Sequence, residues 1–177
     1  QRCDYCYYSN TKKTHSLSKT PQILDQSAAE EIAIFLKNGC KSLHVHELTI
    51  VFHGGEPLLQ PLSNFRKICM ILKKYLADVV CLKFVLQTNG TLFSQKWLGL
   101  LNEFDFSIGI SLDGPKKFHD IHRIYKNGLG TYDKVIDGVK LIQKFNKKDE
   151  LDFGILAVID PQFNAGEIYH HFVDDLG

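Results

Sequence analysis

A pair of cysteines at the start of the chain, Cys3 and Cys6, has the spacing Cys-x-x-Cys. Cysteines at this spacing serve structural zinc sites, redox disulfides and iron–sulfur clusters. Structural zinc usually takes four ligands, but the sequence has no second Cys-x-x-Cys, and its histidine pairs are not at zinc-finger spacing. A redox pair would open a helix, whereas a polar stretch typical of a loop follows Cys6. The pattern therefore favours an iron–sulfur cluster, and at least one further ligand must come from elsewhere.

Four polar motifs further along the chain also contain residue types that bind ligands. They are Gly-Gly-Glu-Pro at 54–57, Gln-Thr-Asn-Gly at 87–90, Ser-Leu-Asp-Gly-Pro at 111–115 and Asp-Pro at 160–161. Each follows an apolar run that predicts a β-strand. In parallel α/β folds, ligand sites lie beyond the carboxyl ends of the strands. We therefore expect these four loops to converge on one face and to form a site.

Alternating strands and helices must position these loops. The predicted strands span residues 48–52, 82–86, 106–112 and 151–159, and the predicted helices span 27–39, 62–72, 94–101, 131–142 and 166–176. Ser27 and Glu30 have the spacing of a capping box, and we expect Gly39 to stop the first helix. The alternation indicates βαβ units and a parallel sheet, so the predicted fold class is α/β. The near-continuous apolar strands suggest that both faces of the sheet are covered.

The composition excludes some classes of partner but does not identify a function. The chain has 177 residues, of which 44% are hydrophobic, and this suits one domain over residues 1–177. Its net charge is +1, which gives no field to attract nucleic acid or an anionic membrane surface, and no apolar run approaches the ~20 residues of a membrane span. We expect neither nucleic acid nor a membrane as a partner. Because the chain begins at Gln1 and ends abruptly at Gly177, we expect it to be part of a longer protein.

The remaining cysteines indicate the redox environment. Cys40, Cys69 and Cys81 stand alone, near or within apolar stretches, and we interpret them as small buried hydrophobes. Five cysteines are an odd number, and no secretory signal is visible, so a disulfide framework is not expected. A cytoplasmic, reducing location is the better expectation.

The cysteine motif resembles a known signature. Arg-Cys-Asp-Tyr-Cys-Tyr-Tyr at 2–8 is similar to the end of the CxxxCxxC signature of the radical S-adenosylmethionine (SAM) superfamily, with Tyr5 as the aromatic residue that commonly precedes the last Cys. The first Cys of that signature would lie two residues before Gln1. Residues 54–57 look like the GGEP loop of the same family.

A subgroup of that family shows a closer resemblance. Residues 111–115, the pair His119-Asp120, Arg123 and Gly-Thr-Tyr at 130–132 are similar to the subgroup that modifies proteins and ribosomally made peptides. This subgroup includes anaerobic sulfatase-maturating enzymes and peptide maturases with a C-terminal SPASM extension. Any one motif is weak, but the ordered set is specific.

The resemblance implies a fold and two cofactors. The fold would be a partial (β/α)6 barrel, and residues 1–177 would be a radical SAM core domain whose first strand, last barrel elements and any SPASM domain lie outside this sequence. Cys3 and Cys6 would ligate a [4Fe-4S] cluster with one iron open to SAM, because soft thiolates suit iron. Auxiliary [4Fe-4S] clusters would belong to the C-terminal region.

The resemblance also implies which residues bind SAM. Glycines 54 and 55 would allow close approach of the backbone to the methionine portion, and Glu56 would accept hydrogen bonds from its amino group. Arg123 would pair with the carboxylate through its planar fork. The remaining SAM contacts would come from Tyr5, Gln87, Asn89, Ser111, Leu156 and Val158, with Tyr5 beside the cluster and adenine, Gln87 and Asn89 near the ribose, Ser111 at the carboxylate or ribose, and 156–158 along the adenine.

Several of these residues also have ordinary interpretations. Gly-Gly-Glu-Pro at 54–57 could be a tight turn, and Asn89 could simply form a turn with Gly90. Ser111 could be a hydroxyl satisfied within the protein, and Arg123 could be a solvated surface charge. Asp113 is a candidate site residue, but nothing in the sequence assigns it, or any other residue, a catalytic role.

The implied activity is that of a radical SAM oxidoreductase acting on a peptide or protein. The first hypothesis is a peptide maturase that crosslinks or oxidises side chains, and the second is an anaerobic sulfatase-maturating enzyme that forms formylglycine. Both would need a reducing partner such as flavodoxin or ferredoxin. A third hypothesis, from another class, is a non-catalytic α/β domain whose cysteine pair binds zinc or is inert.

Overall fold

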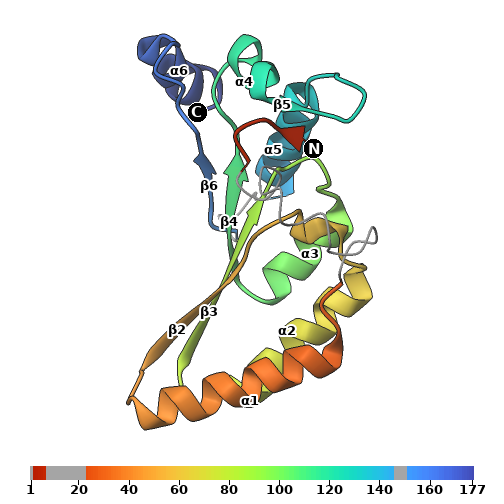
Figure 1. Ribbon diagram of the computed structural model, residues 1–177, viewed down its shortest axis with the longest axis vertical. Coiled ribbons are helices and arrows are strands. Elements are labelled where there is room, and N and C mark those ends of the chain that lie inside the picture. Colours follow the sequence, from red (N-terminus) through yellow and green to blue (C-terminus); the bar gives the residue numbers. More distant parts are fainter. Residues whose placement is uncertain (1, 7–22, 146–150) are drawn as a thin grey trace.

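A parallel sheet of four strands forms the centre of the molecule. The computed structural model describes residues 2–6, 23–145 and 151–177. The sheet has the order β2-β3-β4-β6, with β2 at Glu47–Phe52, β3 at Cys81–Thr88, β4 at Phe106–Ser111 and β6 at Phe153–Leu156. The strands run toward the upper part of Figure 1, where α4 and α6 lie. The predicted α/β class with parallel strands is confirmed.

The helices connect and cover these strands. They are α1 (Gln26–Ser42), α2 (Leu62–Leu76), α3 (Gln95–Glu103), α4 (Lys116–His122), α5 (Tyr132–Phe145) and α6 (Ala165–His170), with the 3-10 helix η2 (Pro57–Leu59) and the π-helical turn η3 (His171–Asp175). All five predicted helices are present, although the last ends in the π-helical turn. Helix α4 was not predicted, and the last strand is shorter than the expected 151–159.

The start of α1 differs from the prediction. Asp25, not Ser27, caps this helix, because its extended backbone lets its carboxylate accept a hydrogen bond of 2.8 Å from the amide of Ala28. Gly39 lies inside the helix, which continues to Ser42. A glycine in a helix interior costs only about 1 kcal/mol relative to alanine, and α1 tolerates that cost.

Among the described residues, helices cover one face of the sheet more fully than the other. Phe84, Leu86, Phe106, Ile108 and Ile110 are buried, whereas the alternate residues of β3 and β4 are only partly buried. Helices α1, α2 and α3 lie on the same side of the sheet in Figure 1. Within residues 23–145 and 151–177, the expectation that both faces are covered is therefore wrong, because an apolar run does not show which side its neighbours occupy. The open face leaves room for the polar residues of the strand ends.

An aromatic core joins the sheet to its helices. The ring centroids of Phe52 and Phe65 are 4.7 Å apart, and Trp97 packs edge-on against Phe65 at 5.2 Å. Phe84 stacks on Phe106 at 5.2 Å. Such pairs stabilise a fold by about 0.5–1.5 kcal/mol each beyond their area burial. The core therefore links three strands to α2 and α3 and sets where the strand ends lie.

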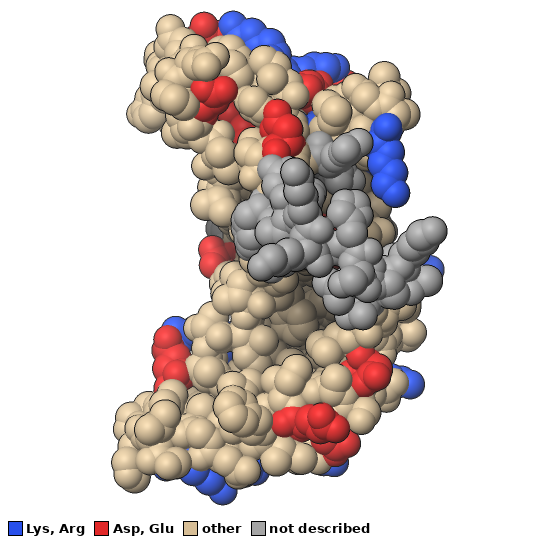
Figure 2. Space-filling model, viewed as in Figure 1, with Lys and Arg blue, Asp and Glu red and all other residues tan. Residues whose placement is uncertain are grey.

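The surface and the other cysteines complete the description. Figure 2 shows acidic and basic side chains interspersed on the visible face, with no large patch of one sign. No helix among the described residues is both long and apolar enough for a membrane crossing. Cys40 and Cys69 are buried as predicted, but Cys81 is exposed, because it begins β3 at the amino end of the sheet.

Candidate active site

The loop after β2 depends on its glycines. Gly54 has φ of 91° and Gly55 has φ of 58°, both in the left-handed region that side chains with a Cβ rarely adopt. The chain then returns to an extended conformation at Glu56, whose carboxylate accepts a hydrogen bond from the amide of Leu58 and caps η2. The sequence Gly-Gly-Glu-Pro thus builds a sharp reversal at the carboxyl end of β2.

Glu56 joins this loop to the next one. Its carboxylate accepts hydrogen bonds from the Thr88 hydroxyl at 2.6 Å and the Asn89 amide at 2.8 Å, in addition to that from Leu58 at 3.1 Å. Burial raises the pKa of Glu56, and these three hydrogen bonds partly offset the rise. A carboxylate has about four acceptor positions, so about one remains for a ligand.

Asn89 forms a turn that its own side chain stabilises. Its side-chain oxygen accepts hydrogen bonds from the amide and the hydroxyl of Thr91, at 2.9 and 2.7 Å. Gly90 follows with φ of 73°, and a Cβ there would lie 3.0 Å from Ile110. These contacts give the side-chain carbonyl of Asn89 a local structural role, in agreement with the interpretation of Asn89-Gly90 as a turn.

Gln87 and Ser111 form a polar pair on the open face. The Gln87 amide donates a hydrogen bond of 3.0 Å to the Ser111 hydroxyl across β3 and β4. Gly109 makes this possible, because a Cβ at that position would lie 2.1 Å from the Gln87 side-chain oxygen. Sequence reasoning missed Gly109, although a glycine inside a strand often marks a close approach.

A buried ion pair lies at the end of β4. Asp113 accepts hydrogen bonds from Arg123 at Nε (2.6 Å) and Nη2 (2.9 Å), from the Tyr5 hydroxyl (2.5 Å) and from the Val158 amide (2.9 Å). We call Tyr5, Asp113, Arg123 and Val158 the Asp113 cluster. Asp113 and Arg123 are only 2% and 7% exposed, so Arg123 is not a surface charge.

The ion pair sets the protonation states of the cluster. Burial opposes the charge on Asp113, but the hydrogen bonds and charge of Arg123 outweigh it and hold the pKa of Asp113 below its usual range. Burial and the hydrogen bond to Asp113 raise the pKa of Tyr5. The cluster therefore contains a carboxylate, a guanidinium and a neutral phenol at neutral pH.

A second set of residues binds the backbone of the ion pair. His119 is buried, accepts a hydrogen bond from the Asp113 amide at 3.3 Å and lies 3.0 Å from the Thr131 hydroxyl, which donates to the Arg123 carbonyl at 2.9 Å. These partners require the neutral imidazole with its proton on Nε2. Burial and the nearby Arg123 lower the pKa of His119 to about 4, in agreement with that form.

The motif residues after His119 also have a structural role. Asp120 accepts a hydrogen bond of 2.9 Å from the Tyr132 amide at the start of α5. A Cβ at Gly130 would lie 2.0 Å from the Asp120 carboxyl carbon, so only glycine leaves room for this contact. The spacing of these motif residues is thus explained by a contact that fixes α4 against the start of α5, on either side of β5 (Arg123–Ile124).

The cysteine loop is held beside Arg123. Strand β1 (Arg2–Cys3) pairs antiparallel with β5, and Cys3 lies opposite Arg123 in the register. The Cys6 amide donates to the Cys3 carbonyl at 3.2 Å, so both cysteines belong to one turn, and neither is in a disulfide. Burial raises the pKa of Cys3, and the charge of Arg123 opposes the rise.

The two thiols fit part of an iron–sulfur ligand set. They lie on one turn, and Cys3 stands opposite Arg123, whose charge favours the thiolate form of Cys3. Within residues 2–6, 23–145 and 151–177, no three His, Cys, Asp or Glu side chains gather as a metal site. Tyr7, Tyr8 and most of the predicted loop after Cys6 lie outside the described residues.

A cavity of about 410 Å³ opens beside the cysteine loop. It is lined by Asp4, Tyr5, His122, Val158 and Asp160. His122 lies between two carboxylates, with Nδ1 3.0 Å from Asp4 and Nε2 3.2 Å from Asp160. The hydrogen bond to Asp4, with a smaller contribution from Asp160, raises the pKa of His122.

The structure thus brings the predicted site residues together in three groups. Tyr5, Arg123 and Val158 meet at Asp113, Gln87 meets Ser111, and Glu56 meets the backbone of Asn89. Leu156 lies at the carboxyl end of β6 and is 57% exposed, with its carbonyl accepting from the amide of Leu112. The sequence singled out Asp113 and His119 within motifs but assigned neither of them the contacts that the structure shows.

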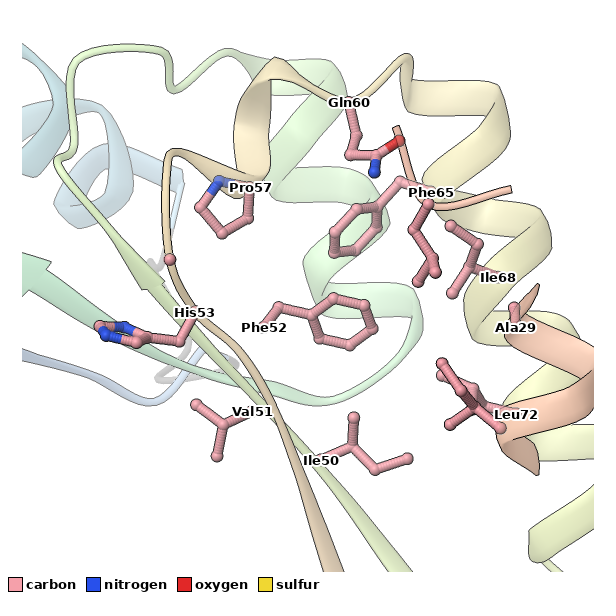
Figure 3. Close-up of a pocket in the computed structure, with 13 residues that line it drawn as sticks. Ala29, Ile50, Val51, Phe52, His53, Pro57, Gln60, Phe65, Ile68 and Leu72 are labelled. Atoms are coloured by element: carbon pink, nitrogen blue, oxygen red, sulfur yellow. The ribbon is translucent and has the colours of Figure 1, made fainter. Parts of the chain in front are cut away.

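A second cavity, of about 290 Å³, lies between β2 and helices α1 and α2. Figure 3 shows Phe52 and Phe65 pointing toward one another inside it, whereas His53 points to the other side of the strand. Its lining is mostly apolar, and it contains none of the charged residues described above. This cavity is an extension of the hydrophobic core.

Comparison with known proteins identifies relatives of the chain. The model of the Radical SAM superfamily matches residues 1–173. A serine-type anaerobic sulfatase-maturating enzyme from Bacteroides thetaiotaomicron is 32% identical over 164 residues, which are 92% of this chain and 37% of that protein. A cysteine-type enzyme from Clostridium perfringens is 30% identical over 175 residues, which are 97% of this chain and 44% of that protein. The chain therefore spans less than half the length of these relatives.

Solved structures show the same relationship. A structure described as native anSMEcpe with bound AdoMet and Kp18Cys peptide has a TM-score of 0.81 and 29% identity, covering 98% of this chain and 44% of that one. The native form with bound AdoMet alone has a TM-score of 0.80, at 29% identity, covering 98% and 46%. The resemblance predicted from the motifs is confirmed, and the chain belongs to the radical SAM superfamily, with relatives among the anaerobic sulfatase-maturating enzymes.

Proposed function

We propose that the protein is a radical SAM enzyme that uses a [4Fe-4S] cluster to cleave SAM and then removes hydrogen from a side chain of a peptide or protein. One observation carries this proposal: the turn with Cys3 and Cys6 is fixed next to Arg123 by the β1–β5 register and by Tyr5. Two thiolates that would hold iron thereby lie beside a guanidinium that would hold the SAM carboxylate.

Cys3 and Cys6 would supply two of the three thiolates of the cluster. When bound, the reduced cluster and SAM supply the one-electron cleavage of a C–S bond and the abstraction of a hydrogen atom. The protein binds and orients the reactants. Cys3 and Cys6 are themselves partly buried, which limits the access of water to their thiols.

The remaining site residues would bind the parts of SAM. Gly54 and Gly55 allow the backbone to approach the methionine portion, and the remaining acceptor position of Glu56 suits its ammonium group. The Gln87–Ser111 pair, on the open face, suits the ribose or carboxylate, and Asn89 lies on the adjoining loop. The backbone of Leu156 and Val158 would run along the adenine, with Tyr5 beside it.

The relatives favour a specific case of this activity. The similar curated proteins are named serine-type and cysteine-type anaerobic sulfatase-maturating enzymes, and the similar structure contains the Kp18Cys peptide. Oxidation of a Ser or Cys side chain to formylglycine is therefore favoured over crosslinking. A flavodoxin or ferredoxin in the cytoplasm would supply the electrons, and any auxiliary clusters would belong to the rest of the protein.

An anaerobic assay of the full-length protein tests the proposal. The protein is reconstituted with iron and sulfide and supplied with SAM, dithionite and a peptide that contains one Ser or Cys in a sulfatase-type sequence. We expect 5′-deoxyadenosine together with an aldehyde on the peptide, measured by mass spectrometry. Deoxyadenosine without an aldehyde would support the enzyme class and reject the formylglycine activity. Zinc in place of iron, with no deoxyadenosine, would reject both.

A further inference from the structure

We infer that Asp113 is a positioning residue, which holds Tyr5 and Arg123 in the arrangement in which the cysteine loop and the SAM carboxylate meet. This inference rests on the proposed function and deepens it, because it concerns a residue that would not touch SAM itself. Asp113 lies 108 positions from Tyr5 in the sequence, and the fold brings their side chains within 2.5 Å.

The hydrogen-bonding capacity of Asp113 is used within the protein. Oδ2 accepts from the Tyr5 hydroxyl and from Arg123 Nε, and Oδ1 accepts from Arg123 Nη2 and from the Val158 amide. A carboxylate accepts about four hydrogen bonds, so these partners saturate it. Asp113 therefore has no capacity left for a ligand, and it acts through the residues that it holds.

Arg123 is oriented by this saturated carboxylate. Asp113 takes the Nε–H and one Nη2–H of the guanidinium, so the remaining N–H groups face away from it. A guanidinium has about five N–H groups in a rigid plane, and the edge that is left matches a second carboxylate. Asp113 thus fixes the direction in which Arg123 presents its charge.

Tyr5 is oriented by the same carboxylate. Its hydroxyl donates to Asp113, and the guanidinium carbon of Arg123 lies 5.5 Å from its ring centre. Because Tyr5 lies between Cys3 and Cys6, this hydrogen bond ties the cysteine turn to Asp113. The three side chains form a closed triangle in which one carboxylate fixes both a residue beside the cluster and a residue that would bind SAM.

The backbone around the triangle is also fixed. His119 accepts from the Asp113 amide, and Thr131 donates to the Arg123 carbonyl, so both members of the ion pair are held behind their side chains. Val158 connects the end of β6, the expected adenine side, to the same carboxylate. Three segments that would contact different parts of SAM therefore share one anchor.

The test measures SAM binding as well as turnover. The full-length protein and its Asp113→Asn variant are reconstituted anaerobically, and iron content, SAM affinity by equilibrium dialysis and the paramagnetic resonance spectrum of the reduced cluster are measured with and without SAM. We expect wild-type iron content and a SAM dissociation constant raised about tenfold, as for the loss of one charge-assisted contact. The spectral change on SAM addition should also be diminished.

Two further variants give graded and control results. Tyr5→Phe removes only the hydroxyl and should raise the dissociation constant about threefold, as for the loss of a weaker hydrogen bond. Asp133→Asn on α5 breaks an exposed ion pair with Lys116 of α4 and should leave affinity and spectrum unchanged.

Several outcomes would overturn the inference. If Asp113→Asn binds SAM with wild-type affinity and spectrum and loses only thermal stability, the ion pair is purely structural. If that variant does not fold, Tyr5→Phe decides, and a wild-type affinity and spectrum in it reject the positioning role. Absence of SAM cleavage in the wild-type protein rejects the proposed function instead, so the two failures are distinguishable.

Discussion

The helix-covered face of the sheet and the loops at its carboxyl ends are built on different principles. The covered face is held by aromatic packing among Phe52, Phe65, Phe84, Phe106 and Trp97, which is stabilised mainly by burial and close contact of apolar rings. The loop end is held by directional hydrogen bonds, with Asp113 and Glu56 each serving several partners. A packed core tolerates substitutions that conserve side-chain volume. The arrangement of the loops, in contrast, depends on individual donor and acceptor atoms. Stability and activity should therefore be separable by mutation.

The largest effect is expected from a cysteine in the loop region. Cys6→Ala in the full-length protein should remove 5′-deoxyadenosine production below detection, because a cluster ligand is lost. The unfolding midpoint of the sheet and its helices should change little, because Cys6 is outside the hydrophobic core. Chromatography measures the deoxyadenosine that is produced, and circular dichroism measures the unfolding midpoint. Retained deoxyadenosine in this variant would remove Cys6 from the ligand set.

A substitution on the covered face is expected to lower stability. Phe65→Ala should lower the free energy of unfolding by about 3–5 kcal/mol, because a fully buried ring leaves a cavity. Met70→Ala on the same helix is the matched control, since its side chain is 56% exposed and the change should stay within about 0.5 kcal/mol. Urea unfolding measures both. An equal loss in the two variants would mean that packing on α2 does not hold the sheet.

A glycine substitution tests the open face with a smaller effect. Gly109→Ala places a methyl group against the Gln87 side chain, which must turn away from Ser111. We expect SAM affinity to fall severalfold with a stability loss of about 1 kcal/mol, the size of one hydrogen bond. Gly99→Ala in α3 meets nothing within 4 Å and should stabilise the protein by up to about 1 kcal/mol. Unchanged SAM binding in Gly109→Ala would remove the Gln87–Ser111 pair from the site.

The smallest effect is a pH dependence at the cavity. The folded-state pKa of His122 is raised above the unfolded value of about 6.5 by Asp4 and Asp160, so its stabilising contribution is complete below about pH 6.5. It is lost as pH rises through the raised pKa. The stability difference between wild type and His122→Gln should therefore shrink from pH 6 to pH 8. A difference that is constant with pH would contradict the charged pairing.

The sequence predicts the periodic parts of the molecule better than the long-range polar ones. Strands and helices with regular apolar patterns, such as β3 and α5, were located because their period is a local property. Helix α4 was missed because Lys-Lys-Phe-His-Asp-Ile-His at 116–122 is mostly polar and short. The loops were predicted from polar motifs that follow apolar runs. The motifs at 54–57, 87–90 and 111–115 lie at the carboxyl ends of β2, β3 and β4, whereas β6 ends at Leu156, before Asp-Pro at 160–161.

The pairings within the site could not be predicted in the same way. The sequence left Arg123 open between a surface charge and a ligand contact, since nothing local shows that Asp113 will bury it. The Tyr5 contact joins residues 108 positions apart, and only the folded chain reveals it. Gly109 and Gly130 carried a readable signal, because each gives room to one polar side chain, Gln87 and Asp120 respectively.

The pairing of β1 with β5 has a consequence for chain length. Cys3 stands opposite Arg123 through backbone hydrogen bonds, so the side on which its thiol emerges is set by counting residues along the ladder. Inserting or deleting one residue next to Cys3 would turn that thiol to the opposite side of the ladder while leaving every side chain chemically intact. Natural variation in this segment should therefore consist of substitutions, with insertions confined to regions outside the paired residues.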